Sequence, residues 1–330
     1  MIKIRKQITF GDIEYSNRKR RTRREEFLTM MDKIMPWKAF VELVRPVYFK
    51  GERGRPPIGI ETMLRMYFLQ IWFTLSDEAV EDGIYDSYAM RSFMGLNFLE
   101  NQSPDSTTLV KFRKLLVDND IQIQLMYMVA EILEANGYIM RGGSIVDAAI
   151  FSAPASIKNS EGKRDPEMSP TKKNNQYYFG AKAHIGCDAG SGYVLDVETT
   201  AANVADITQA HVLIRPDDEV VYADAGYTGL EKREEIKDDP QLSKIDFRIN
   251  EKRSCIPKNL DGQMEAFAKY QEQRKTAVRS KVEYPFHIVK NIFGFRKTTY
   301  RGLVKLHARL CALFLSANLY MCARAGRQLA

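Results

Sequence analysis

The spacing of apolar residues changes character once along the chain, close to Gly142. Between Ile60 and Gly137 apolar residues recur every three to four positions, the period of helices that bury one face. Nearer the N-terminus, the acidic pair at 25–26 also indicates the first turn of a helix. Helices are therefore predicted over 60–73, from a cap at Ser76 to Tyr85, over 106–116 with a cap at Asp105 or Ser106, and over 121–136.

After Gly142 the pattern is typical of strands. Five are predicted, over 144–152, 176–188, 193–200, 219–224 and 245–249. Helices are expected over 205–214, over 230–237, from about 276, and over 303–325, and the polar stretch 251–275 is expected to be an insertion or loop. Three antiparallel strands, a helix and then strand–helix–strand is the element order of a ribonuclease-H-like domain. The predicted fold class is α+β, with a helical N-terminal domain before a mixed five-stranded sheet flanked by helices.

Charge is distributed unevenly over the segments that these elements define. We expect a basic arm and linker over 1–56, the helical domain over 57–140, the sheet domain over 141–326 and a tail over 327–330. Residues 1–55 carry a net charge of +8, residues 277–330 carry +9, and the residues between them carry −10. Basic ends around an acidic middle favour polyanion-binding flanks on a metal-binding centre, although solvated tails give the same charge pattern.

Composition argues against several classes of protein. The first residues lack the apolar stretch of a signal peptide, and the most apolar run, 63–75, is interrupted by Arg65 and too short to span a bilayer. The cysteines form no C-x-x-C pair and are scattered, at Cys187, Cys255, Cys311 and Cys322. The chain also has no phosphate-binding G-x-x-x-x-G-K-[ST] loop. We therefore expect a cytoplasmic protein without a membrane partner.

Three carboxylates carry the candidate chemistry. Asp147 and Asp224 lie within strand-like apolar runs, where a carboxylate is costly unless it is paired or bound to metal. Glu283 lies between two cations, with Arg279 four residues before it and Lys290 seven after it. Phosphodiester chemistry by two Mg²⁺ or Mn²⁺ ions requires such hard oxygen ligands. The pattern predicts a DNA-cutting enzyme, while each acid taken singly is also compatible with a turn or a solvated helix.

Several basic residues are candidates for contact with DNA. An intact helix would align Arg279 with Glu283, and Lys290 further along, although Pro285 is expected to kink or restart that helix. Lys182 and His184 alternate on a predicted strand and so face one side, where a DNA contact and a structural role are both possible. The helix over 106–116 is predicted to expose three cations and is the candidate recognition helix, through Lys111, Arg113 and Lys114.

Taken together, these motifs resemble the bacterial insertion-sequence transposases of the DDE type, insertion sequence 5 group. The matching pieces are Ile-Val-Asp-Ala at 145–148, Asp-Pro-Glu-Met at 165–168, and the stretches 176–186, 199–203, 222–227, 279–290, 293–297 and 300–305. The helical stretch 54–116 also looks like this group's N-terminal domain, so that the resemblance covers residues 25–322. One departure is Thr276, where the wider signature often has Tyr.

The resemblance implies a function for these residues. Asp147, Asp224 and Glu283 would form the catalytic triad and hold two Mg²⁺ or Mn²⁺ ions. Double-stranded DNA would be the partner, as transposon ends and as target, with at least a homodimer joining two ends in the bacterial nucleoid. The last two motifs add candidate DNA contacts at Arg296, Lys297 and Arg301.

Two other functions remain open from the sequence. A stand-alone metal-dependent nuclease of the same fold would cut DNA without joining the cut end to a target. A DNA-binding regulator that has lost catalysis would bind DNA and carry out no chemistry.

Overall fold

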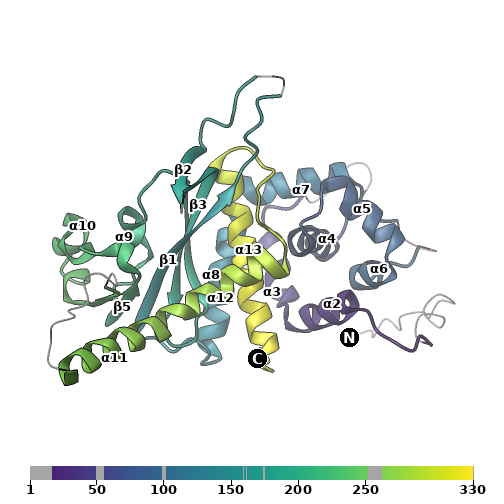
Figure 1. The fold of residues 1–330 in the computed structure, drawn as a ribbon. Coiled ribbons are helices and arrows are strands. Elements are labelled where there is room, and N and C mark those ends of the chain that lie inside the picture. The colour runs from purple at the N-terminus through teal and green to yellow at the C-terminus, as the bar shows by residue number, and fades with distance from the viewer. Residues whose placement is uncertain are drawn as a thin grey trace.

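Helices gather at the N-terminal side of the molecule and a mixed sheet at the other, with the C-terminal helix between them (Figure 1). The structure is a computed structural model that describes residues 17–49, 56–98, 102–158, 160, 162–173, 175–251 and 262–329. The mixed α+β class and the helical N-terminal region predicted from the sequence are confirmed.

The N-terminal region contains the predicted helices, one of them at the acidic pair 25–26, and two more. Ser76 caps one predicted helix by accepting a hydrogen bond from the backbone N–H of Ala79, at 3.1 Å. Two helices, over residues 23–34 and 37–44, lie within the segment 1–56 for which an arm and linker were predicted, and their apolar side chains reach the core. Residues 1–16 and 50–55 lie outside the described residues. The helices are α2 (Arg23–Ile34), α3 (Trp37–Val44), α4 (Ile60–Phe73), α5 (Asp77–Asp86), α6 (Tyr88–Met94), α7 (Ser106–Asp118) and α8 (Ile121–Ala135).

The sheet contains the five predicted strands and one that the sequence pattern did not reveal. Its strands are β1 (Gly143–Ser152), β2 (Ser169–Lys173), β3 (Gln176–Asp188), β4 (Val194–Ala201), β5 (Val220–Ala223) and β6 (Asp246–Ile249). β3 pairs antiparallel with β1, β2 and β4, whereas β1, β5 and β6 run parallel. β2 is the additional strand, and its sequence, Ser-Pro-Thr-Lys-Lys, lacks an apolar face. Short helical turns connect the later strands, at η1 (Asp206–Gln209), α9 (Ala210–Leu213), η2 (Ala225–Tyr227), η3 (Leu230–Lys232), α10 (Glu234–Lys237) and η4 (Leu242–Lys244).

A long helical rod follows the sheet and tests two expectations (Figure 1). α11 (Gly262–Arg279) is helical where a loop was expected; residues 252–261 of that stretch lie outside the described part of the chain. α11 is mostly polar, so it has no apolar stripe to detect, and it is made of good helix formers such as Gln, Glu, Lys and Arg. The expectation that Pro285 kinks or restarts the helix is confirmed, because α11 stops at Arg279, the turn η5 (Ser280–Val282) follows, and a new helix, α12 (Glu283–His287), begins two residues before Pro285. The π-helical turn η6 (Ile288–Ile292) ends the rod.

The last helix, α13 (Leu303–Arg324), is the centre of the main core. It packs against α8 and α2 on one side and against β4 on the other. Inside this core the Asn318 side chain bonds both backbone groups of Val194 in β4, at 2.8 and 2.7 Å. α13 is long and apolar enough to cross a membrane, but 78% of its most apolar window is buried inside the protein. One continuous core therefore joins the helical region to the sheet, and a smaller core covers the other face of the sheet.

The cap of α7 gives a test of this packing. Asp105 accepts hydrogen bonds from the backbone N–H of Thr108 and from the Thr107 hydroxyl, both at 2.6 Å. Asp105→Ala is expected to lower the free energy of unfolding by about 1 kcal/mol, because the first backbone N–H groups of α7 then lose the side chain that caps them. Urea denaturation measures the loss. Asp118→Ala removes the same charge at the other end of α7 and should cost nothing; equal effects of the two variants would contradict the capping role.

Candidate active site

Asp147, in the middle of β1, and Asp224, directly after β5, come together on two parallel strands. Ile145 of β1 lies opposite Tyr222 of β5, so that two residues further on Asp147 lies in line with Asp224. Side chains alternate along a strand, and Val146, Val221 and Ala223 all face the smaller core. The two carboxylates therefore share the opposite face of the sheet.

Each of the two carboxylates is also held locally. Asp224 begins the turn η2, where its Oδ1 accepts a hydrogen bond from Gly226 N–H at 2.8 Å. The Asp147 Oδ1 accepts the backbone N–H of Ala148 at 2.8 Å. A turn-forming role for Asp224 was an open alternative, and the structure contains that turn beside the candidate site.

The electrostatics of Asp147 are unusual. Its side chain is only 21% exposed, and burial raises the pKa of the carboxyl from 3.8 to about 6. The hydrogen bond from Ala148 lowers this pKa, the charge of Asp224 raises it, and the Arg279 guanidinium lowers it. Burial and a neighbouring carboxylate thus outweigh the two cations that act on this carboxyl, Arg279 and Lys173, so a further cation would stabilise this site.

Arg279 connects Glu283 to the strand carboxylates. The Arg279 guanidinium lies 3.8 Å from the Asp147 carboxylate and 3.0 Å from that of Glu283. The four-residue spacing of the Arg and the Glu along the rod brings these two side chains together, and Arg279 reaches Asp147 of β1. Glu283 is 63% exposed in its side chain, which leaves it free to change rotamer.

The donor set fits a divalent cation. Asp147, Asp224 and Glu283 offer only carboxylate oxygens, which suit Mg²⁺ and Mn²⁺ better than softer metals. The incompletely compensated charge of buried Asp147 is the observation that favours a cation here. Within the described ranges no group of three or more His, Cys, Asp or Glu side chains is arranged to hold a metal ion, since Glu283 is paired with Arg279. Binding would require the Glu283 side chain to leave Arg279.

Lys290 and two candidate DNA contacts surround the distal half of β1. The Lys290 ammonium donates to the backbone carbonyl of Ile150 at 3.1 Å and lies 4.8 Å from the centre of the Phe151 ring. Burial lowers the pKa of this half-buried lysine. Arg296 is exposed and donates to the Lys290 carbonyl at 3.1 Å, and Lys297 is exposed beside Ser152, the last residue of β1.

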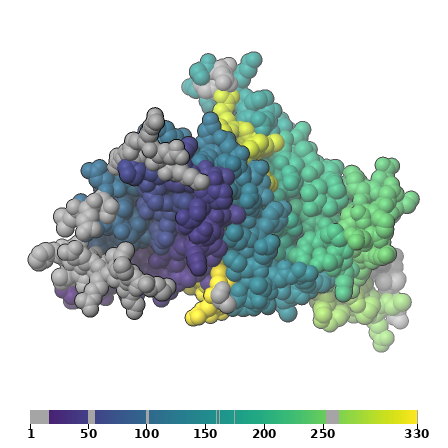
Figure 2. Space-filling model, turned by 180° about the vertical axis from the view of Figure 1, so that it is seen from behind, coloured from purple at the N-terminus to yellow at the C-terminus, as the bar shows by residue number. Residues whose placement is uncertain are grey.

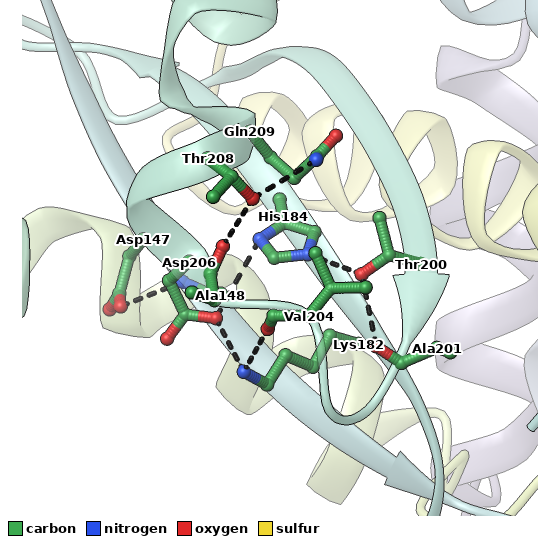
Figure 3. Close-up of polar contacts among 11 residues, drawn as sticks. Asp147, Ala148, Lys182, His184, Thr200, Ala201, Val204, Asp206, Thr208 and Gln209 are labelled. Atoms are coloured by element: carbon green, nitrogen blue, oxygen red, sulfur yellow. Dashed lines mark hydrogen bonds and ion pairs between the residues drawn. The ribbon is translucent and has the colours of Figure 1, made fainter. Parts of the chain in front are cut away.

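Lys182 and His184 have their partners inside the protein (Figure 3). The Lys182 ammonium is 2.8 Å from the Asp206 carboxylate and donates to the Val204 carbonyl at 2.7 Å. His184 is fully buried, its Nε2 bonds the Thr200 hydroxyl at 2.8 Å, and burial lowers its pKa to about 4. The predicted DNA contact of His184 is therefore wrong in this structure, because no surface of the ring is accessible. For Lys182, the contacts with Asp206 and Val204 are those of a structural role, the second role that the sequence left open.

The predicted recognition helix presents fewer cations than expected. Lys111 and Lys114 are exposed on α7, but Arg113 is only 17% exposed in its side chain. Arg113 pairs with Asp77 of α5 and donates to Gln70 of α4 at 2.8 Å. The prediction that α7 exposes Arg113 is wrong, because two other helices supply its partners.

Sequence reasoning missed part of the groove beside Asp224. A cavity of about 800 Å³ opens between the strand ends and α11, and Asp224 and Arg279 are among its lining residues. Asn250 follows β6 directly, and the register of β5 with β6 places it in line with Asp224. Its amide donates to Thr276 and to Glu272, at 3.1 Å each. Thr276, where the wider signature often has Tyr, thus contacts the residue that follows β6. The sequence signal that could have identified Asn250 as part of this groove is its position directly after a predicted strand.

Comparison with known proteins relates this chain to transposases. Residues 16–115 match the family described as Transposase domain (DUF772). One solved structure aligns over 92% of this chain and 74% of its own, a cryo-EM structure of the piggyBac transposase synaptic complex with hairpin DNA. Its TM-score is 0.41 at 11% identity, a likeness too low to support any inference. Residues 140–319, more than half of the chain, match the Transposase DDE domain, and the chain therefore belongs to the DDE transposase family.

Proposed function

We propose that this chain is a DNA transposase of the insertion sequence 5 group. It would bind the inverted-repeat ends of its element, cleave phosphodiesters there and join the freed 3′-OH ends to target DNA. The observation that carries the proposal is the pair of carboxylates in line on parallel strands, with Arg279 between Asp147 and Glu283. The ribonuclease-H-like assignment of the sheet half is part of the same proposal.

The site residues would divide the chemistry among them. Family membership implies dependence on a divalent metal, and Asp147, Asp224 and Glu283 are the proposed ligands of two Mg²⁺ or Mn²⁺ ions. Such ions activate the attacking oxygen and stabilise the leaving oxygen of an in-line displacement. Arg279 would neutralise a phosphate bound over the carboxylates, and Lys290 would neutralise a neighbouring one; their contacts with Asp147 and with the Ile150 carbonyl support these roles.

Assembly and location follow from the proposed reaction. Because two DNA ends must be joined in one event, we propose at least a homodimer on DNA. Candidate backbone contacts are the exposed cations Lys111, Lys114, Arg296 and Lys297, together with Arg301. The reaction would take place in the bacterial cytoplasm, at the nucleoid.

Incubation of the purified chain with labelled element-end DNA and a plasmid target tests the function. Cleavage and end joining are expected with Mg²⁺ and should be absent with a chelator. Glu283→Gln is expected to abolish both products, since it removes one proposed ligand while leaving the fold intact. Glu78→Gln, at an exposed position on α5, is the matched control and should behave like the wild type.

The pattern of products distinguishes the alternatives. Cleavage without joining, with the target present, would identify a stand-alone nuclease of the same fold. Binding of the end DNA without any chemistry would identify a regulator. Activity of Glu283→Gln equal to that of the wild type would remove Glu283 from the site.

A further inference from the structure

A basic cleft lies where the N-terminal helices meet the start of α13. Its volume is about 560 Å³, and α7, α13 and the 299–301 segment between η6 and α13 line it. Five of its lining residues are cations and one, Asp118, is acidic. Figure 2 shows the segment before α13, in yellow at the top, reaching the surface between the N-terminal helices and the sheet half. The cationic lining residues are Arg113, Lys114, Arg301, Lys305 and Arg309.

Arg309 is the unusual member of this set. The residue is only 5% exposed, and its guanidinium lies 4.9 and 5.1 Å from the ring centres of Phe295 and Tyr300. One nitrogen donates to the Tyr300 hydroxyl at 2.8 Å, whereas the buried Nε has no hydrogen-bond partner among the described residues. Asp77, the carboxylate nearby, already pairs with Arg113. A desolvated guanidinium without a carboxylate of its own is costly and is stabilised by an anion.

We infer that this cleft binds a phosphate group, and that in the working protein the group is a phosphodiester of bound DNA. A planar guanidinium matches the oxygens of a phosphate, and the rim cations Lys114 and Lys305 add charge without geometric demands. The assignment to DNA rests on the proposed function, whereas the phosphate chemistry of the cleft does not.

The chain path places the cleft within reach of a duplex held at the active site. Ser152 lies five positions after Asp147 along β1. Ser152 forms a parallel β-bridge with Lys297, and Tyr300 follows Lys297 by three positions. At about 3.3 Å per residue this path is no longer than about 35 Å. One turn of B-DNA rises about 34 Å. A backbone phosphate about one turn or less from the scissile bond can therefore occupy the cleft.

The first arm of the test uses inorganic phosphate alone. Phosphate exchanged for chloride at constant ionic strength should raise the Tm of the wild type by about 2 °C at ten times the Kd of the phosphate. The rise should disappear in Lys114→Ala/Lys305→Ala, whose two sites are exposed and leave the fold intact. Lys237→Ala/Lys244→Ala removes two exposed charges near β5 and β6 and should keep the rise.

The second arm measures binding to duplex DNA as a function of salt. Loss of two phosphate contacts should reduce the slope of log Kobs against log salt by about 2 in the Lys114/Lys305 variant only. A phosphate-dependent Tm rise with unchanged DNA slopes would mean that the cleft takes a small free phosphate, and would overturn the assignment to DNA. Absence of both effects would overturn the site itself. Neither arm requires catalysis, so wild-type cleavage is scored separately and failure of the proposed function remains distinguishable.

Discussion

Asp147→Asn is expected to abolish strand cleavage while making the metal-free protein more stable at neutral pH. Loss of an electrostatic group that acts on the transition state lowers a rate by about 10²–10³-fold, and a shared metal ligand should reach at least that. The stability gain has a separate cause. Burial raises the pKa of Asp147 from 3.8 to about 6, and each pKa unit corresponds to about 1.4 kcal/mol, so the ionised form costs about 3 kcal/mol at pH 8.

The sign of this effect depends on pH. Above pH 6 folded Asp147 is mostly ionised, at a cost that asparagine avoids, whereas near pH 4 the folded group is protonated and most of the cost is gone. The stability gap between variant and wild type should therefore close as the pH falls from 8 to 4. Mg²⁺ should also narrow the gap at pH 8, because only the wild type binds it.

Chemical denaturation in a chelator at pH 8 and pH 4 measures the gap, and end-DNA cleavage measures the activity. Asp82→Asn, at an exposed position on α5, is the control and should change neither. A variant that loses both cleavage and stability at pH 8 would indicate that Asp147 stabilises the fold, and would contradict the proposal that its ionised carboxylate is kept for catalysis at a cost in stability.

Lys182→Met is expected to destabilise the fold by about 2 kcal/mol without altering the salt dependence of DNA binding. The substitution leaves the Asp206 carboxylate, 38% exposed in its side chain, without the cation 2.8 Å away. Breaking a fully buried pair costs about 3–5 kcal/mol, and partial exposure of Asp206 reduces that figure. The Val204 carbonyl also loses its donor.

A double variant and a titration separate the roles of this cluster. Lys182→Met/Asp206→Asn should recover much of the loss, because no charge is left without its partner. The pKa of His184, about 4 in the wild type, should rise in Lys182→Met, since the lysine charge lowers it and Asp206 raises it. The wild type therefore loses stability as pH falls from 6.5 towards 4, and the variant loses less over that range. A reduced DNA salt slope in Lys182→Met would instead support the DNA contact predicted from the strand pattern.

The fold was predictable wherever burial imposed a period. α4 and β3 coincide with their predicted ranges, because one is apolar nearly all round and the other lies in the middle of the sheet. α11 and β2 were missed for one shared reason. Both are polar and largely exposed, so their sequences have no apolar face that distinguishes them from loops.

The candidate site likewise contains residues that the sequence predicts and contacts that it does not. Asp147 and Asp224 were identifiable because a carboxylate within an apolar strand requires an explanation, and Glu283 because its spacing from Arg279 suits one helix face. The partners of Arg113 and Lys182 were not identifiable. Asp77 is 36 residues from Arg113, and Asp206 reaches Lys182 only through the return of the chain after β4. Helical or strand spacing gives the side on which a cation lies, but not whether a distant segment covers it.

The central position of α13 in the core affects how the chain can fold while it is being synthesised. α2 packs against α13, yet almost the whole chain separates Ile34 from Leu303. At about 5–20 residues per second, synthesis of the intervening stretch takes roughly 15–55 s. During that time the first helices have no partner for the apolar side chains that α13 will cover. A polypeptide truncated before Leu303 would never acquire that partner, so we expect such products to be cleared by proteolysis and not to persist as competing DNA binders.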